Sequence, residues 1–217
     1  EENDAPPDDR GVEFDPHLFM SQLPPYRHVG PAFHARNASP ALPAKRFPDR
    51  LDVVLDLDET LVHCAMDGEP QQPGDVEMLE HDFEFSVSFQ DEACRVRAKT
   101  RPGLVDFLRR ASRRFEVTVF TASQRVYAEA LLDRLDPEGE LVHHRLYRDS
   151  CLLVGGNFVK DLRHVFSTRA RSSTCAVDLS RVLLVDNSPH AFSYDTDNGV
   201  PIVSWFDDAR DGELPKL

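Results

Sequence analysis

Short strand-like segments and longer helix-like segments alternate along the chain from Leu51 onward. Four stretches are short and apolar, as buried strands of a parallel sheet are: 51–57, 116–121, 181–187 and 201–206. Two stretches space their apolar residues with the period of a helix: 104–115 and 125–135. This alternation predicts an α/β fold with a doubly wound, mainly parallel sheet and helices on both of its faces.

One section departs from this alternation. "FEFSVSF" at 83–89 and "CRVRAKT" at 94–100 alternate apolar and polar residues with a period of two, which predicts a β-hairpin with its turn near 90–92. A polar loop at 67–75 precedes it. We therefore expect a small β-hairpin insertion at about 67–99, between the first strand and its helix. The alternative is that both segments are strands of the main sheet, because a period of two does not identify the sheet.

Residues 1–50 differ from the rest in composition, since they hold nine of the 16 prolines and show little periodicity. They predict an extended, proline-rich N-terminal arm that is partly disordered, the first ten residues above all. Only the later part of this arm is expected to lie against the domain. Residues 51–217 are expected to form one domain, a size that allows a substantial core.

Charge and cysteine content narrow the partners and the compartment. The net charge of −13 argues against non-specific binding to nucleic acids or anionic membranes. No apolar run reaches the roughly 18 residues that a membrane span needs. The four cysteines show no paired spacing, so neither a disulfide framework nor a zinc site is indicated, and a reducing intracellular compartment is expected.

Three of the predicted strands end in polar side chains: "LDLDET", "VFTAS" and "LLVDNS". Ligands of open α/β sheets bind outside the carboxyl ends of the strands. If the strands are parallel, one edge of the sheet gathers a set of oxygen-bearing side chains: Asp56, Asp58, Thr121, Ser123, Asp186 and Asn187. Carboxylate and amide oxygens suit Mg²⁺, which takes one or two carboxylates together with substrate oxygens and water.

Four motifs in this order, "DLDETL", "FTAS", "VKDL" and "DNSP", resemble those of the aspartate-based phosphatases of the haloacid dehalogenase superfamily. More narrowly, they are similar to the branch that dephosphorylates the C-terminal tail of RNA polymerase II and to its small nuclear relatives. The resemblance runs from about Leu51 to Glu213. It implies a Mg²⁺-dependent phosphatase that acts on phosphoserine or phosphothreonine through an aspartyl-phosphate intermediate.

The resemblance also implies roles for the carboxylates and the metal ligands. Asp56 would be the nucleophile that attacks phosphorus. Asp58 would protonate the leaving oxygen and later activate water. A side-chain oxygen of Asp56, the backbone oxygen of Asp58 and the side chain of Asn187 would bind Mg²⁺, while Asp186 would support Asn187 or Lys160 from behind.

Other matched positions concern the phosphoryl group and the peptide. Thr60, Thr121 and Lys160 are expected to orient the first loop and hold the phosphoryl oxygens. Ser123 is expected to cap the helix that follows it. Arg148 and Tyr127 correspond to peptide contacts in the small phosphatases. Met66 and Gln124 replace apolar residues of the pocket that holds a proline beside the phosphoserine, which predicts a weaker preference for that proline.

Two other functions stay open at this point. The chain could be a small-metabolite phosphatase of the same superfamily, or a non-catalytic relative that acts as a binding module. The expected partner is a phosphorylated protein or peptide, and we expect a monomer. The location would be nuclear or cytoplasmic, or at the nuclear envelope if an upstream segment anchors the protein.

Overall fold

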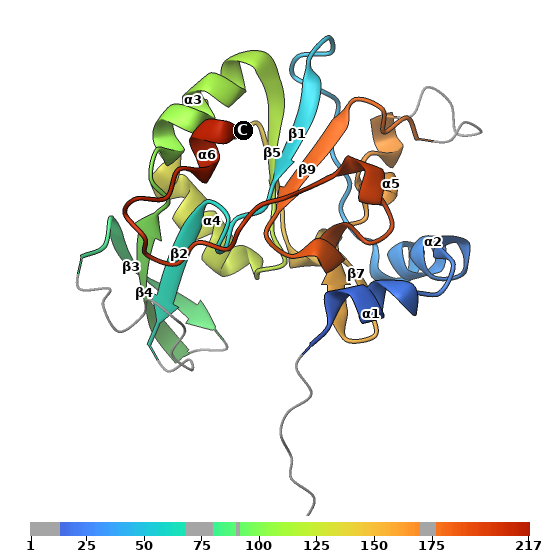
Figure 1. The fold of residues 1–217 in the computed structure, drawn as a ribbon. Helices are drawn as coiled ribbons and strands as arrows, with labels where there is room; N and C mark the ends of the chain where they lie inside the picture. The colour runs from blue at the N-terminus through green and yellow to red at the C-terminus, as the bar shows by residue number, and fades with distance from the viewer. Residues whose placement is uncertain (1–13, 68–79, 90–91, 170–176) are drawn as a thin grey trace, which may run out of the picture.

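A five-stranded parallel sheet forms the centre of the computed structural model, in the order β10-β9-β1-β5-β6 (Figure 1). Each neighbouring pair of strands is parallel. This confirms the predicted α/β fold with a mainly parallel sheet. The strands are β1 (Leu51–Leu55), β5 (Phe115–Phe120), β6 (His144–Leu146), β9 (Val182–Asp186) and β10 (Gly199–Pro201).

The structure describes residues 14–67, 80–89, 92–169 and 177–217. The predicted disorder of residues 1–10, most of the polar loop at 67–75, the first two residues of the predicted turn at 90–92, and Cys175 lie outside these ranges. No helix in the described ranges combines the length and apolar character needed to cross a membrane.

The central sheet has a hydrophobic core on each face. Val53 and Leu55 of β1 pack into one core together with α3 (Leu104–Arg114) and α4 (Arg125–Leu135). Val54 points the other way, into a second core with α5 (Leu162–Val165). Because a core covers each face, side chains that point to either face are apolar at Val53, Val54 and Leu55. Figure 1 shows α3 and α4 on one side of the sheet and α5 on the other.

A separate antiparallel sheet, in the order β2-β4-β3, confirms the predicted hairpin insertion. Its strands are β2 (Val62–Met66), β3 (Phe83–Phe89) and β4 (Glu92–Thr100). The alternative placement of the hairpin in the central sheet is wrong. The small sheet is also wider than predicted, because it includes β2. This strand starts at Val62, directly after the loop of residues 56–61, which we call the first acidic loop.

Two details of the central sheet differ from the prediction. The strand predicted at 201–206 is wrong: β10 ends at Pro201, and the chain then leaves the sheet edge. Ile202 and Trp205 are buried but do not belong to a strand, so their apolar character did not indicate strand structure. The sequence pattern also missed β6, a short strand whose His144 and Arg145 hide the apolar signal.

The N-terminal arm, residues 14–50, contains two helices instead of the predicted extended chain. Prolines begin these helices rather than prevent them, because Asp15 caps α1 (Pro16–Ser21) and Pro16 occupies its first turn. The second helix, α2 (Tyr26–Asn37), packs on β7 and α5. The imidazole of buried His34 lies 2.9 Å from Asp161.

The last part of the arm binds to the starts of β1 and β5, at the edge of the sheet opposite Asp56 and Thr121. Buried Glu116, in β5, accepts the backbone N–H groups of Arg46 at 2.7 Å and Phe47 at 3.0 Å. Asp52, in β1, is paired with Lys45 at 2.5 Å and with Arg169 at 2.6 Å. The arm is therefore bound along its described length to the rest of the protein.

The remaining elements are short. A hairpin of β7 (Leu152–Val154) and β8 (Asn157–Val159) lies beside α1 and α2. The others are η2 (Arg148–Ser150), η3 (Ser167–Arg169), η4 (Pro189–Phe192), η5 (Thr196–Asn198) and α6 (Glu213–Lys216).

Candidate active site

The polar ends of β1, β5 and β9 converge on one cleft, as the parallel arrangement predicts. Buried Leu57 points into the core, so that Asp56 and Asp58 on either side of it point into the cleft. The cleft has a volume of about 240 Å³. We call it the strand-end cleft, and its lining includes Asp56, Asp58, Glu59, Thr121, Ser123, Arg148, Phe158, Lys160, Asp186, Asn187 and His190.

Lys160 joins two of the aspartates at the bottom of the cleft. Its ammonium group donates to Asp56 Oδ1 and to Asp186 Oδ2, both at 2.5 Å, and only 2% of Lys160 is exposed. Burial alone would lower the pKa of Lys160, but the two carboxylates raise it above the usual range. Burial raises the pKa of Asp186 to about 7, although Lys160 opposes the shift. Lys160 is thus a fixed positive charge beside Asp56.

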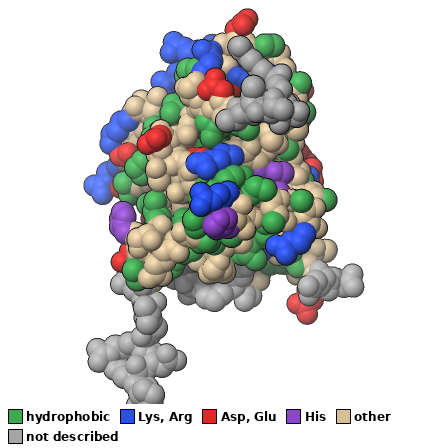
Figure 2. All heavy atoms as spheres, turned by 90° about the vertical axis from the view of Figure 1, so that its right-hand side faces the viewer, with side chains coloured by type: hydrophobic (Ala, Val, Ile, Leu, Met, Phe, Trp, Pro, Cys, Tyr) green, Lys and Arg blue, Asp and Glu red, His purple; other side chains and the backbone are tan. Residues whose placement is uncertain are grey.

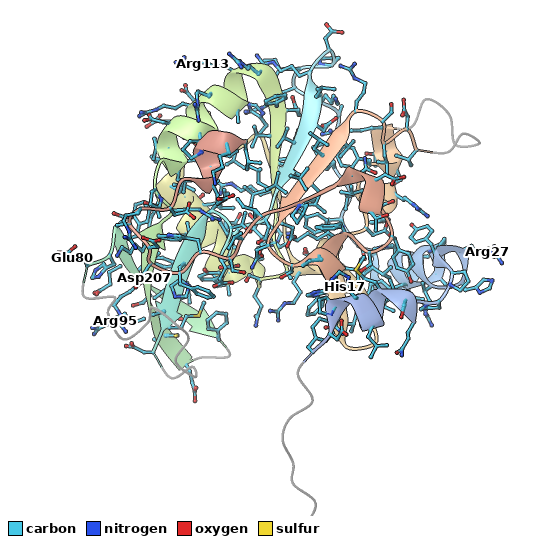
Figure 3. All side chains as sticks on the ribbon, viewed as in Figure 1. His17, Arg27, Glu80, Arg95, Arg113 and Asp207 are labelled. Atoms are coloured by element: carbon cyan, nitrogen blue, oxygen red, sulfur yellow. The ribbon has the colours of Figure 1, made fainter. Side chains whose placement is uncertain are left out.

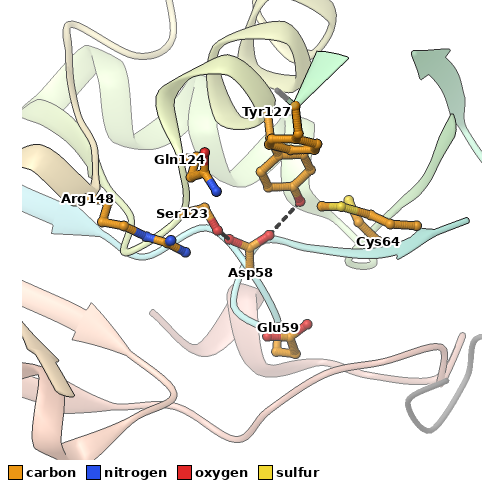
Figure 4. A pocket seen from close by; sticks show the side chains of 9 residues that line it. Asp58, Glu59, Cys64, Ser123, Gln124, Tyr127 and Arg148 are labelled. Atoms are coloured by element: carbon orange, nitrogen blue, oxygen red, sulfur yellow. Dashed lines mark hydrogen bonds between the residues drawn. The ribbon is translucent and has the colours of Figure 1, made fainter. Parts of the chain in front are cut away.

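Asp58 has different surroundings, since hydroxyl groups rather than a cation hold it (Figure 4). Tyr127 donates to its Oδ1 at 2.5 Å, and Ser123 donates to its Oδ2 at 2.8 Å. Thr121 also donates to Oδ2, at 3.2 Å. Burial, followed by the charges of Glu59 and Asp56, raises the pKa of Asp58 to about 6. Asp58 can therefore carry a proton near neutral pH.

The residues predicted to bind Mg²⁺ suit that ion. Asp56 Oδ2 receives no hydrogen bond from any described residue, so it is available to a cation. The amide of Asn187 donates to Ser204 at 3.0 Å, and its Oδ1 accepts from Thr60 at 3.3 Å, which fixes the amide orientation. One carboxylate, one carbonyl and one amide oxygen form a hard-ligand set. Across the described ranges, no three His, Cys, Asp or Glu side chains form a competing metal cluster.

Thr60 differs from its predicted role. It is fully buried and does not line the strand-end cleft; its hydroxyl supports Asn187 instead of a phosphoryl oxygen. Its backbone oxygen accepts from Arg101 at 3.1 Å. Arg101 is itself 1% exposed and forms two 2.8 Å bonds to Asp211, so it links the first acidic loop to the C-terminal segment.

A second cavity of about 280 Å³, which we call the side pocket, adjoins the strand-end cleft. It brings together the four residues predicted to contact the peptide. Arg148 lines both cavities; its Nε donates to Ala122 O at 2.6 Å, and its guanidinium lies 5.0 Å from the Phe158 ring centroid. The lining of the side pocket is Asp58, Glu59, Cys64, Met66, Phe89, Ser123, Gln124, Tyr127 and Arg148 (Figure 4).

Sequence reasoning missed three features of the site. Ser123 does not cap the following helix: the cap position is Gln124, and the Ser123 hydroxyl binds Asp58. Glu59 has a φ of 54°, in the left-handed region, and its carboxylate lies 3.2 Å from buried His63. His190, in the cleft wall, follows the "DNSP" motif directly, and that proximity was the one signal available.

Comparison with known proteins adds a family match. The model of the NLI interacting factor-like phosphatase family matches residues 51–217. CTD small phosphatase-like protein 2 of Dictyostelium discoideum is 42% identical over 207 residues, which cover 94% of this chain and 32% of that protein. The unmatched part of this chain is shorter than α1 and α2 together, so the match includes at least part of these helices.

Two further proteins resemble the chain over a shorter part. Carboxy-terminal domain RNA polymerase II polypeptide A small phosphatase 1 of Homo sapiens is 39% identical over 169 residues, covering 78% of this chain and 57% of that protein. The chain thus spans about a third to just over half of these two curated relatives. The structure of fission yeast RNA polymerase II CTD phosphatase Fcp1 bound to beryllium fluoride shares the fold, with a TM-score of 0.57, 23% identity, and coverage of 76% and 44% of the two chains.

Proposed function

This chain belongs to the NLI interacting factor-like phosphatase family, and on that basis we propose that it is a Mg²⁺-dependent phosphatase of phosphoserine and phosphothreonine in proteins. One observation carries the proposal. Asp56 and Asp58 share a cleft but have different environments, since Lys160 holds the first and hydroxyl groups hold the second. Two carboxylates in different surroundings can perform two different tasks in one reaction.

In the first step, an Asp56 carboxylate oxygen attacks the phosphorus atom of the substrate. A phosphorus–oxygen bond forms to Asp56, and the bond to the serine or threonine oxygen breaks. The leaving oxygen takes the proton that Asp58 carries. The ammonium group of Lys160 offsets the negative charge on the phosphoryl oxygens as they move toward Asp56.

In the second step, Asp58 is a base because it has given up its proton. It accepts a proton from a water molecule, whose oxygen attacks the phosphorus atom of the aspartyl phosphate. The bond between phosphorus and Asp56 breaks, inorganic phosphate leaves, and both carboxylates return to their initial states. The hydrogen bonds from Tyr127 and Ser123 keep Asp58 in one place during both proton transfers.

The metal would be held by Asp56, by the backbone oxygen of Asp58 and by Asn187. When bound there, Mg²⁺ supplies positive charge that favours binding and transfer of the phosphoryl group. Thr60 and Ser204 hold the Asn187 amide from two sides, which supports its assignment as a ligand.

For the substrate, the human relative is named for the carboxy-terminal domain of RNA polymerase II, and we include that tail among the candidate substrates. The side pocket beside Asp58 supports a polypeptide substrate over a small metabolite, because it offers room for a neighbouring residue. Nuclear or cytoplasmic action would follow from such a substrate, and action at the nuclear envelope is compatible with the same chemistry.

A phosphoserine peptide incubated with the full chain and Mg²⁺ tests the proposal. We expect release of inorganic phosphate, and mass spectrometry of acid-quenched, digested enzyme should locate a phosphoryl group on Asp56. Phosphate transfer to another residue would refute the mechanism. If neither the peptide nor an aryl phosphate is hydrolysed, the enzymatic function is refuted.

A further inference from the structure

The N-terminal arm reaches the wall of the strand-end cleft. His190 lines that cleft, and the rings of Phe14 and Phe19 pack edge-on against it, with centroids 5.0 and 6.0 Å away. Phe19 also lies against the tip of the β7–β8 hairpin, where a Cβ added to Gly155 would come within 3.5 Å of its ring. Helix α1 therefore lies next to the part of the cleft wall that contains His190.

Large apolar side chains are exposed on this part of the surface. Phe14 is 48% exposed and Leu18 is 53% exposed. Leu153, on the adjoining strand β7, is 44% exposed. Exposed apolar residues scattered singly need no explanation, but a group on neighbouring elements is typical of an interaction site. We call the surface of Phe14, Leu18 and Leu153 the arm surface.

Helix α2 of the arm has the opposite charge to the chain as a whole. It contains Arg27 and Arg36 but no aspartate or glutamate, in a chain with a net charge of −13. Figure 2 shows the side of the molecule that carries α2 and α5, with basic, histidine and hydrophobic side chains in its centre. This side suits an acidic or phosphorylated polypeptide.

The position of the arm relative to the cleft points to the occupant. In Figure 3, His17 on α1 and Arg95 of the three-stranded sheet lie on opposite sides of the carboxyl ends of the central strands. A polypeptide with one residue in the strand-end cleft can leave it past His190 and meet α1. The helices lie outside the residues that the family model matches, so this contact would add to the family's catalytic body.

We propose that the arm surface is a second contact site for the phosphorylated substrate, where it binds an apolar residue at a distance from the phosphorylated side chain. Acidic residues farther along the substrate would face the cations of α2. The inference rests on the proposed function, because it names the kind of polypeptide that the same cleft takes. It predicts that substrate length matters, since a short phosphopeptide cannot reach from Asp56 to Leu18.

The experiment compares two phosphopeptides with the same phosphoserine and immediate neighbours. The short one ends there, and the long one continues on both sides with apolar and acidic residues. We expect a higher kcat/KM for the long peptide in the wild-type chain. Leu18→Glu should lower the long-to-short ratio by about tenfold, mainly through KM, because a carboxylate replaces an apolar contact and repels an acidic peptide. Leu18→Lys should lower the ratio less.

The matched control is Leu51→Glu, which makes the same change at a 38% exposed leucine at the start of β1, away from the cleft. An equal ratio for wild type, Leu18→Glu and Leu51→Glu, with both peptides hydrolysed, would overturn the arm surface but leave the proposed function intact. Loss of self-association in Leu18→Glu with an unchanged ratio, measured by sedimentation, would identify a second copy as the occupant and also overturn it. Inactivity of the wild type on both peptides would refute the function itself.

Discussion

The hydroxyl of Tyr127 lies 2.5 Å from Asp58 Oδ1 and donates a hydrogen bond to it. Tyr127 is 2% exposed, so its ring is part of the protein core and only its hydroxyl end reaches the side pocket. Burial raises the pKa of Asp58 to about 6, while the hydrogen bond from Tyr127 favours the ionised form and limits that rise. One residue thus belongs to both the expected peptide pocket and the expected proton-transfer group.

Tyr127→Phe should move the pH profile of kcat. Asp58 must be protonated for the first step, so activity should fall as the pH rises through its pKa. Removing the hydroxyl destabilises the ionised form, raises that pKa and shifts the basic limb upward by about one pH unit. Ser123→Ala should shift it in the same direction. Steady-state rates between pH 5 and 9 check this, and a basic limb that stays in place would contradict the role given to Tyr127.

Asp56→Asn and Asp58→Asn should fail at different steps. Asp56→Asn should abolish turnover and phosphoenzyme formation, because the attacking carboxylate is gone. Asp58→Asn should lose most turnover but can accumulate aspartyl phosphate, because attack by Asp56 survives when water activation fails. Rapid-quench labelling and peptide mapping distinguish the two variants. Undiminished turnover by Asp56→Asn would rule out the assignment.

Removal of metal should silence the enzyme reversibly. EDTA treatment should reduce phosphate release to background, and Mg²⁺ should restore it. Asn187→Ala should raise the Mg²⁺ concentration needed for half-maximal activity by about 10- to 100-fold if the amide is a ligand. Calorimetric titration of Mg²⁺ provides a second measurement. Activity that persists after rigorous chelation would exclude the metal from the reaction.

Gln124 and Met66 should determine how the side pocket treats a proline beside the phosphoserine. Both residues line it together with Tyr127. Gln124→Leu combined with Met66→Phe should increase the ratio of kcat/KM for a Ser-Pro phosphopeptide to that for an aryl phosphate by about 10- to 200-fold, since apolar contact replaces polar surface. A ratio equal to that of the wild type would mean that these residues do not select the neighbouring proline.

Arg101→Met should destabilise the fold strongly. It breaks a buried pair with Asp211 and removes donors to the backbone oxygens of Thr60 and Val203. Breaking a buried ion pair on one side typically costs about 3–5 kcal/mol of unfolding free energy. Arg97→Met, at an exposed pair with Asp67 at 3.5 Å, is the control and should cost about 1 kcal/mol or less. Urea unfolding measures both, and equal losses would contradict this account of Arg101.

Much of the site could be predicted because topology follows from the strand pattern. Once three strands are parallel, their carboxyl ends must meet, and Asp56, Thr121 and Asp186 come together without any further information. Lys160 could be assigned to the same site only from the order of the four motifs. Thr60 could not be placed in this way, because a tight loop turns its side chain under Asn187 and away from the cleft.

The errors have equally local causes. Ile202 and Trp205 are buried although they do not belong to a strand, and burial alone does not distinguish a loop from a strand. The prolines of the arm predict an extended chain, although Asp15 followed by Pro16 is also a common beginning of a helix. The hydroxyl of Ser123 had two possible partners, a helix end and a carboxylate, and only the fold brings Asp58 near it.

Because the arm is bound to Glu116 and Asp52, the domain that the family model defines differs from the part of the chain that we expect to fold as one unit. The family model begins at residue 51, so residues 51–217 are the unit that the family model describes. A chain shortened to that unit would keep every catalytic motif but would lose the Arg46 and Phe47 donors to buried Glu116 and the Lys45 partner of buried Asp52. Asp52 would keep Arg169 and Glu116 would keep His144, but each buried carboxylate would lose part of its hydrogen bonding, which opposes folding. For this protein, therefore, the segment that the family model describes is smaller than the segment that we expect to unfold as one cooperative body.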